Sequence, residues 1–303
     1  MSYPNLNSVL NLSFSRSISG QSVAARIGRT NYSQLTILND VPGQSHPYHL
    51  VDLSPWPLQT SVVLGTAVAS FVLTFAGAQG ASTLFFLSVF SLIVHMSLWF
   101  SDVVGEGTLN GDHTAVVLKG LVLGMTLFII TEVIFFGFVF WAYLHSSLSP
   151  AVELGSLWPP LGIDPLEAGA IPTLNTALLL SSGASVTWSH HALIAGDRKG
   201  AILGLILTIV LAIVFTGLQG FEYVTASFTM ADSVYGNTFY FGTGAHGLHV
   251  MMGTIMLAVA GARIASYHLT NAHHVGFEAG ILYWHMVDVV WLALYVLFYW
   301  WGS

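Results

Sequence analysis

The sequence contains no cysteine and few charged residues, and both shortages narrow the kinds of protein that it can encode. Without cysteine there is no disulfide framework, no iron–sulfur cluster and no thiolate metal site. Charged residues make up 7% of the chain, whereas soluble domains usually contain about 25%. Because 54% of the residues are hydrophobic, the chain could not cover itself with polar surface in water. The composition therefore indicates a protein that is surrounded by lipid.

Several sequence features of nucleic-acid-binding proteins and of common enzyme classes are also missing. The sequence has no basic patch of the kind that binds nucleic acid. It has no nucleophile elbow, no phosphate-binding Gly-Lys-Ser loop and no zinc-protease motif. Function therefore has to be sought in the apolar segments and in the few polar residues among them.

Seven apolar runs dominate the chain. Each is about long enough to cross a bilayer as a helix, which takes roughly 20 residues. Strand-like alternation is missing, and in lipid only helices or closed barrels satisfy the backbone. No internal repeat is visible, which argues against the inverted-repeat plan of many transporters. The sequence therefore predicts an all-α integral membrane protein with transmembrane helices near 59–77, 82–101, 119–145, 173–194, 201–224, 239–264 and 279–301.

Residues 1–45 differ from the rest, being rich in Ser and Asn with no acid before Asp40. This composition resembles a mitochondrial transit peptide, and the alternative is a partly ordered tail on one membrane face. We expect an N-terminal extension (1–45) followed by a transmembrane domain (46–303). That domain opens with "HPYHLVDLSPWPL" (46–58), interpreted as an interfacial segment with Trp56 at the depth of the lipid head groups.

The basic residues predict the orientation of the helices. If the N-terminus lies on side A of the membrane, all seven bases fall on side A: Arg16, Arg26, Arg29, Lys119, Arg198, Lys199 and Arg263. The opposite linkers hold acids and no base: Glu153, Asp164, Glu167, Glu222 and Asp232. The positive-inside rule expects this asymmetry. It supports seven spans, because one span more or fewer would scatter the bases over both faces.

The stretch "IITEVIFFGFVFWAYLH" (129–145) places a carboxyl group, Glu132, deep in an apolar span. Glu132 lies roughly 20 Å along a helix from Lys119, near the bilayer midplane. An ionised carboxylate there costs at least ~2.5 kcal/mol, so we expect the Glu132 carboxyl to be protonated, to be paired with another group, or to have a functional role. Two interpretations remain: a proton-handling, reactive carboxyl, or a structural acid that is hydrogen-bonded across helices. Asp288 is its nearest rival and is expected to pair within its own helix.

Thirteen histidines raise the question of metal or haem binding. In "HGLH" (246–249), His246 and His249 share a helix face, which could suit an iron or another metal. Interfacial or interhelical hydrogen bonding is favoured instead, because metal-binding bundles usually add carboxylates or histidines from facing helices. The polar segment "WFSDVVGEGTLNGDHT" (99–114) could gather protons or contact lipid head groups, or be an ordinary solvated loop. The glycines of "FGTGAHG" (241–247) are interpreted as close helix packing.

Long motifs carry a resemblance to a known family. From His46 to Ser303 the chain resembles subunit III of mitochondrial cytochrome c oxidase, in order and with matching spacing. The motifs that carry it are "HPYHLVDLSPWPL", "TEVIFFGFVFWAYLHSSLSP", "WPPLGI", "LNTALLLSSGASVTWSHHAL", "GTGAHGLHV" and "HHVGFEAGILYWHMVDVVWLALYVLFYWWGS". The resemblance implies seven transmembrane helices in a V of two plus five, with phospholipids in the cleft.

The resemblance also implies a function within the respiratory chain. The subunit carries no catalytic centre and binds no haem, copper or other metal, because haem and copper belong to partner subunits. It packs beside the catalytic subunit I and the other subunits of complex IV, which can join a respiratory supercomplex. There it supports proton uptake and protects the oxidase during turnover. The expected location is the mitochondrial inner membrane with the N-terminus on the matrix side, so side A would be the matrix.

Individual residues follow from the same resemblance. Glu132 occupies the position of the family's carbodiimide-reactive carboxyl. Head groups of phospholipids, cardiolipin included, are expected near Trp99, Glu106, Thr108, His113, Arg263 and His268, and the guanidinium of Arg263 suits a phosphate. This chain departs from the common pattern at Ser101, Gly105 and Ala272, where many members carry a base.

Two other hypotheses compete with this one. An independent seven-helix proton channel or transporter would be expected to show midplane helix breaks and a second internal charge. A redox subunit with histidine-ligated haem would show a Soret band in isolation.

Overall fold

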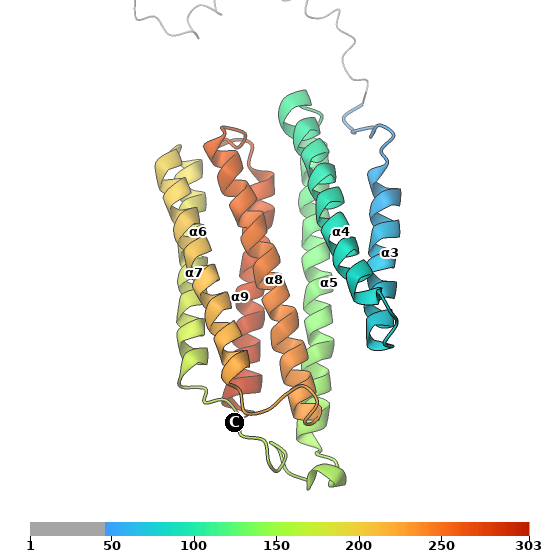
Figure 1. Ribbon diagram of the computed structural model, residues 1–303. Coiled ribbons are helices and arrows are strands. Elements are labelled where there is room, and N and C mark those ends of the chain that lie inside the picture. The colour runs from blue at the N-terminus through green and yellow to red at the C-terminus, as the bar shows by residue number, and fades with distance from the viewer. Residues whose placement is uncertain (1–45, 303) are drawn as a thin grey trace, which may run out of the picture. The chain divides into compact units, whose positions relative to one another are not determined.

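The computed structural model describes residues 46–302, so the predicted extension (1–45) lies outside the described residues. Contacts divide the chain after Pro47, and the architecture below is that of Tyr48–Ser303. Its long helices are joined in sequence and run in alternate directions (Figure 1). They are α3 (Trp56–Phe75), α4 (Ala81–Gly105), α5 (Ala115–Leu148), α6 (Ile171–Ile194), α7 (Arg198–Thr225), α8 (Val234–Ala265) and α9 (Val275–Leu294). The π-helix η3 (Glu106–Asn110) extends α4, η5 (Tyr295–Trp300) extends α9, and the 3₁₀ turn η4 (Val152–Leu154) lies after α5.

Each predicted span corresponds to one helix, although several helices begin earlier than the apolar pattern indicates. The reason is capping, because a side-chain oxygen accepts a free N–H of the first turn. Thr114 accepts from Val117 N (3.4 Å) before α5, and Asp197 accepts from Gly200 N (3.0 Å) before α7. Ser233 accepts from Tyr235 N (3.1 Å) before α8. These polar caps lie outside the apolar runs, so hydropathy misses them.

Six of the helices in the described part of the chain are long and apolar enough to cross a membrane, and α6 is the exception. Several of its polar side chains are buried against other helices. The hydroxyls of Ser185 and Thr208 are 2.7 Å apart, and Trp284 Nε1 donates to Ser182 Oγ (3.0 Å). Because these polar groups are hydrogen-bonded inside the bundle, α6 can belong to it without the apolar composition of the other helices. It runs beside α7 as the seventh helix of the fold (Figure 1).

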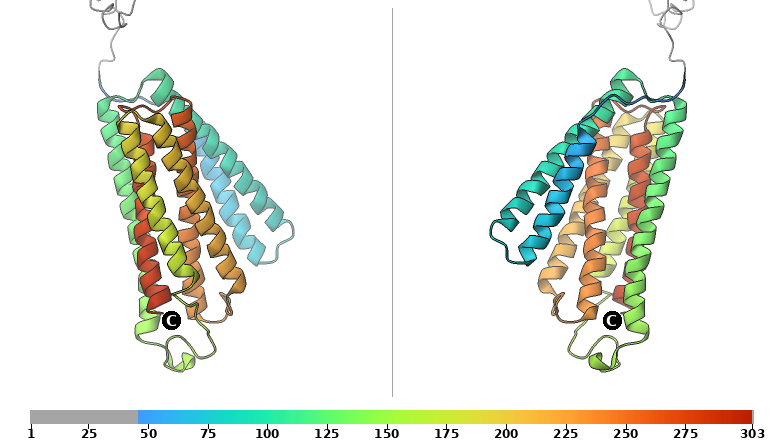
Figure 2. Two further views of the ribbon diagram at one scale, coloured as in Figure 1. Left: turned by 90° about the vertical axis from the view of Figure 1, so that its left-hand side faces the viewer. Right: turned by 90° about the vertical axis from the view of Figure 1, so that its right-hand side faces the viewer.

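The helices form two groups. α3 and α4 pack on each other, and α5–α9 pack on one another. The two groups meet on side A, where α4 ends, and diverge towards the opposite side of the membrane, called side B (Figure 2). The expected seven-helix V of two plus five is therefore confirmed.

Glycine brings α8 close to its neighbours at two positions. A Cβ atom on Gly242 would lie 3.2 Å from the Phe298 ring, and one on Gly253 would lie 2.8 Å from Trp284 Cε3. Small residues permit such close approach between membrane helices. The predicted role of the "FGTGAHG" glycines in helix packing is confirmed at Gly242.

Candidate functional site

The carboxyl group of Glu132 on α5 meets an imidazole from α8. Its Oε2 lies 2.8 Å from His249 Nε2, and His249 Nδ1 lies 2.7 Å from the carbonyl oxygen of Ala245. A carbonyl can only accept, so Nδ1 carries a proton. Nε2 then either accepts from a protonated Glu132 or, as an imidazolium, donates to its carboxylate. Both states have no net charge, which explains how an acid persists in an apolar span.

Aromatic rings enclose this pair. The ring of His249 lies 5.1 Å from that of Phe136 and 6.1 Å from that of Tyr283, between centroids. The side chains of Glu132 and His249 keep 20% and 17% of their exposure. The pair is therefore only partly enclosed by the described residues.

The two histidines of "HGLH" have different partners. His246 is buried, and its Nε2 lies 3.1 Å from the carbonyl oxygen of Val287 on α9. His249 instead bonds to Glu132 on α5. Interhelical hydrogen bonding, which the sequence favoured for these histidines, is confirmed.

Four of the six expected lipid-binding residues lie together on side A. Arg263 Nη2 donates to Thr108 Oγ1 (3.0 Å), and Arg263 Nε is buried with no hydrogen-bond partner among the described residues. Glu106 and Arg263 both act electrostatically on His113. Burial lowers the pKa of His113, and the electrostatic effects of His49 and Arg263 lower it further. The negative charges of Glu106 and Asp112 act in the opposite direction and raise this pKa. His113 is therefore biased towards the neutral imidazole.

The other two expected residues are less closely placed. Trp99 lies on α4, roughly 10 Å along the helix from Glu106. His268 follows α8; its backbone N–H donates to the carbonyl oxygen of Arg263 (2.9 Å), and its side chain is exposed. Among the contacts between described residues, none joins the side chains of Trp99 or His268 to this cluster.

Sequence reasoning missed His49, which belongs to the same region. Its ring lies 5.8 Å from that of His113 between centroids, and its Nε2 lies 3.9 Å from Asp112 Oδ2. His49 and His113 are separated by two helices in the sequence, so spacing alone could not join them. The only signal was the histidine-rich segment "HPYH" that enters the first helix.

Two groups among the described residues have donor atoms close enough to hold a metal ion: His49, Glu106 and His113, and His190, His274 and Glu278. In each group the donor atoms lie within 4.8 Å of one another. In the second group His274 Nε2 lies 3.2 Å from Glu278 Oε1, one turn further along the chain.

Two further carboxyl groups lie inside the bundle. Glu222, expected in a linker on the side opposite the bases, is instead a buried residue of α7, and its Oε2 accepts from the hydroxyl of Tyr299 (3.0 Å). The linker assignment was wrong because Glu222 stands at the end of an apolar run and its partner comes from a distant helix. Asp288 pairs with His285 one turn earlier on α9 (3.4 Å), as expected.

Comparisons with known proteins agree with this architecture. The profile of the family described as cytochrome c oxidase subunit III matches residues 46–303. Cytochrome c oxidase subunit 3 of Podospora anserina is 58% identical over 260 residues, which cover 86% of this chain and 97% of the relative.

More distant relatives carry the same description. The subunit 3 of Rhizopus stolonifer is 54% identical over 272 residues (90% of this chain, 96% of the relative). That of Arabidopsis thaliana is 52% identical over 264 residues (87% of this chain, 99% of the relative). The chain therefore belongs to the cytochrome c oxidase subunit III family and is a multi-span helical subunit of that oxidase.

Proposed function

We propose that this chain is the non-redox subunit III of complex IV in the mitochondrial inner membrane. In this role it packs beside the catalytic subunit I, binds phospholipids and sustains proton uptake and stability of subunit I during turnover. Membership of the oxidase family supports the set of partners, which includes the other complex IV subunits. It also favours this function over an independent channel, a transporter or a haem-bearing subunit.

The observation that carries lipid binding is the buried, unpartnered Nε of Arg263. A buried donor without an acceptor costs about 1–3 kcal/mol, so a bound acceptor would relieve it. A lipid phosphate fits, because guanidinium binds phosphate through several N–H groups at once. Thr108 Oγ1, 3.0 Å from Arg263 Nη2, adds a hydroxyl beside the same position.

Apolar surface for the acyl chains continues along the helices next to this site. α3 and α4 expose large apolar side chains along most of their length, among them Val62, Val68, Phe86, Phe90 and Ile93. In lipid such a surface is covered by hydrocarbon chains or by other subunits. A phospholipid, cardiolipin included, would place its phosphate at Arg263 and its chains against this surface.

The basic residues support a matrix-facing side A. Lys119, Arg198, Lys199 and Arg263 lie at the ends of helices on side A, whereas Glu153, Asp164, Glu167 and Asp232 lie on side B. Under the positive-inside rule this distribution supports a matrix-facing side A, and we propose the matrix side for the N-terminus as well.

Lipid binding is tested by Arg263→Gln in the purified oxidase. We expect the variant complex to retain less phospholipid, measured by mass spectrometry after detergent exchange, and to inactivate faster during turnover. Lys119→Gln is the matched control, because Lys119 is an exposed base on the same side. Equal lipid content in the wild type and both variants would overturn the lipid site.

Glu132 is proposed to be the carbodiimide-reactive carboxyl, because it is a partly exposed carboxyl group in an apolar span, and its Oε2 lies 2.8 Å from His249 Nε2. Glu132→Gln should assemble, lose labelling by dicyclohexylcarbodiimide and lower proton pumping only in part, because Gln can still hydrogen-bond to His249. Complete loss of pumping in reconstituted vesicles would make Glu132 an obligatory relay instead. Failure to assemble would show that the acid itself is needed for folding.

A further inference from the structure

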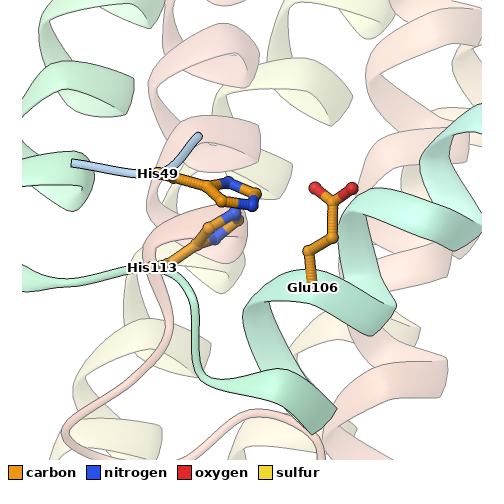
Figure 3. A group of neighbouring side chains, drawn as sticks. All are labelled: His49, Glu106 and His113. Atoms are coloured by element: carbon orange, nitrogen blue, oxygen red, sulfur yellow. The ribbon is translucent and has the colours of Figure 1, made fainter. Parts of the chain in front are cut away.

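Three donor side chains from separate segments converge on side A. His49 comes from the segment before α3, Glu106 begins the π-helix η3, and His113 lies in the turn before α5. Figure 3 shows the two imidazole rings one beside the other, with the carboxylate of Glu106 next to them. Their donor atoms all lie within 4.8 Å of one another. Ligands of tetrahedral zinc lie about 3.3 Å apart, so small side-chain rotations would bring all three onto one ion.

We propose that His49, Glu106 and His113 bind a divalent transition-metal cation of the zinc class, which joins the α3–α4 pair to α5. Two imidazoles and one carboxylate are a ligand set used by zinc and by ferrous iron. Magnesium and calcium prefer oxygen donors, so this set selects against them. A fourth coordination position remains open for water.

The surrounding charges favour a cation. Glu106 and Asp112 each contribute a negative charge near His113, and Arg263 contributes a positive one. Arg263 is directed to Thr108 and so does not occupy the ligand positions.

Local backbone geometry holds one ligand in place. A Cβ atom on Gly107 would lie 2.5 Å from His113 Nδ1, so the imidazole packs directly on the backbone of η3. Isolated π-helical turns are frequent at functional sites, and here the turn presents both Glu106 and the glycine surface. The site also lies on side A, where the two groups of helices meet (Figure 2). A bound cation would therefore fix the position of the helix pair.

The test measures zinc bound to the purified oxidase complex. The complex is stripped with a chelator, loaded with Zn²⁺, freed of unbound metal by gel filtration, and analysed for zinc by mass spectrometry. We expect His49→Gln to retain one zinc ion fewer per complex than the wild type, with affinity at the site reduced by about 100-fold or more. His273→Gln is the matched control, because His273 is an exposed histidine on the same side outside the group.

Further variants separate the possible outcomes. Glu106→Gln, which keeps the size of the side chain, replaces His49→Gln if that variant fails to assemble. Arg263→Gln should lose lipid and keep the zinc, whereas His49→Gln should do the reverse, so the lipid and metal proposals fail independently. Equal zinc in His49→Gln, Glu106→Gln and wild type would overturn the metal site. So would a loss of zinc that occurs only in His190→Gln, which disrupts the second histidine group.

Discussion

The α3–α4 pair and the α5–α9 group bury very different side chains. α3 buries Ala67 and Ser70, and α4 buries Ala81 and Ser88, all of them small. α9 buries large aromatic side chains, including Trp284. Lipid is as apolar as leucine, so membrane helices are held together by close packing and hydrogen bonds rather than by the hydrophobic effect. The five-helix group therefore has a core of its own, whereas the pair leaves most of its apolar surface to lipid or to neighbouring subunits.

Hydrogen bonds show the same contrast. In the five-helix group, buried side chains bond between helices, as Trp284 does to Ser182 and Tyr299 does to Glu222. The pair is joined at its end by an exposed bond, from Trp56 Nε1 to Asp102. Buried polar bonds fix one arrangement of helices, because leaving either partner unsatisfied is costly. An exposed bond can be exchanged for water, so it specifies less.

The largest difference should appear when a methyl group is added to a glycine in each group. Gly253→Ala would place its Cβ 2.8 Å from the rigid ring of Trp284, whereas Gly65 on α3 has no atom near its Cβ position. Overpacking typically costs about 1–3 kcal/mol, so Gly253→Ala should lower the thermal unfolding temperature of the complex. Gly65→Ala should leave it unchanged or raise it slightly, because alanine favours helix. Equal effects at both positions would contradict the contrast between the groups.

A moderate effect is expected from Tyr299→Phe. This change removes the hydroxyl that donates to Glu222 Oε2 and leaves a fully enclosed carboxyl with one partner fewer. The cost should be about 1–3 kcal/mol, measured by thermal or denaturant unfolding. Tyr267→Phe is the control, because the hydroxyl of Tyr267 is exposed and its ring would still stack under Arg198. A Tyr299 variant as stable as this control would show that Glu222 finds another donor.

The smallest effect is expected from Trp56→Phe. It removes the hydrogen bond to Asp102 on α4 but keeps an aromatic ring at the membrane interface. The change in stability should stay within about 0.5 kcal/mol, because the bond is exposed. A double-mutant cycle with Asp102→Asn isolates the bond itself. A coupling energy as large as the cost of Tyr299→Phe would mean that the pair is held much more specifically than its burial indicates.

Much of the fold followed from the composition of the chain. Apolar runs and the placement of the bases predicted seven helices, and each appears in the structure. Hydropathy alone does not explain why α6 satisfied this prediction. The structure does, because three of its serines (Ser182, Ser185 and Ser189) and Asn175 are buried among other helices. Helix ends were less predictable, since capping residues such as Thr114 and Ser233 lie outside the apolar pattern.

For the candidate sites, too, the sequence predicted some features and missed others. A lone carboxyl in an apolar span was enough to select Glu132, and helical spacing was enough to place His246 and His249 on one face. Neither of these two patterns indicated that Glu132 hydrogen-bonds to His249, or that His246 hydrogen-bonds to a backbone carbonyl of α9. The family resemblance selected Glu106, Thr108, His113 and Arg263, which lie together, but it did not select His49.

By itself the sequence determined the solvent, the number of helices and the face that carries the bases, because these depend on composition and on order along the chain. Tertiary structure decided which polar groups are partners, since Glu132 and His249, Glu222 and Tyr299, and His49 and His113 come from segments far apart in sequence. In an apolar medium each polar group needs a partner, and only packing of the helices determines which one is within reach.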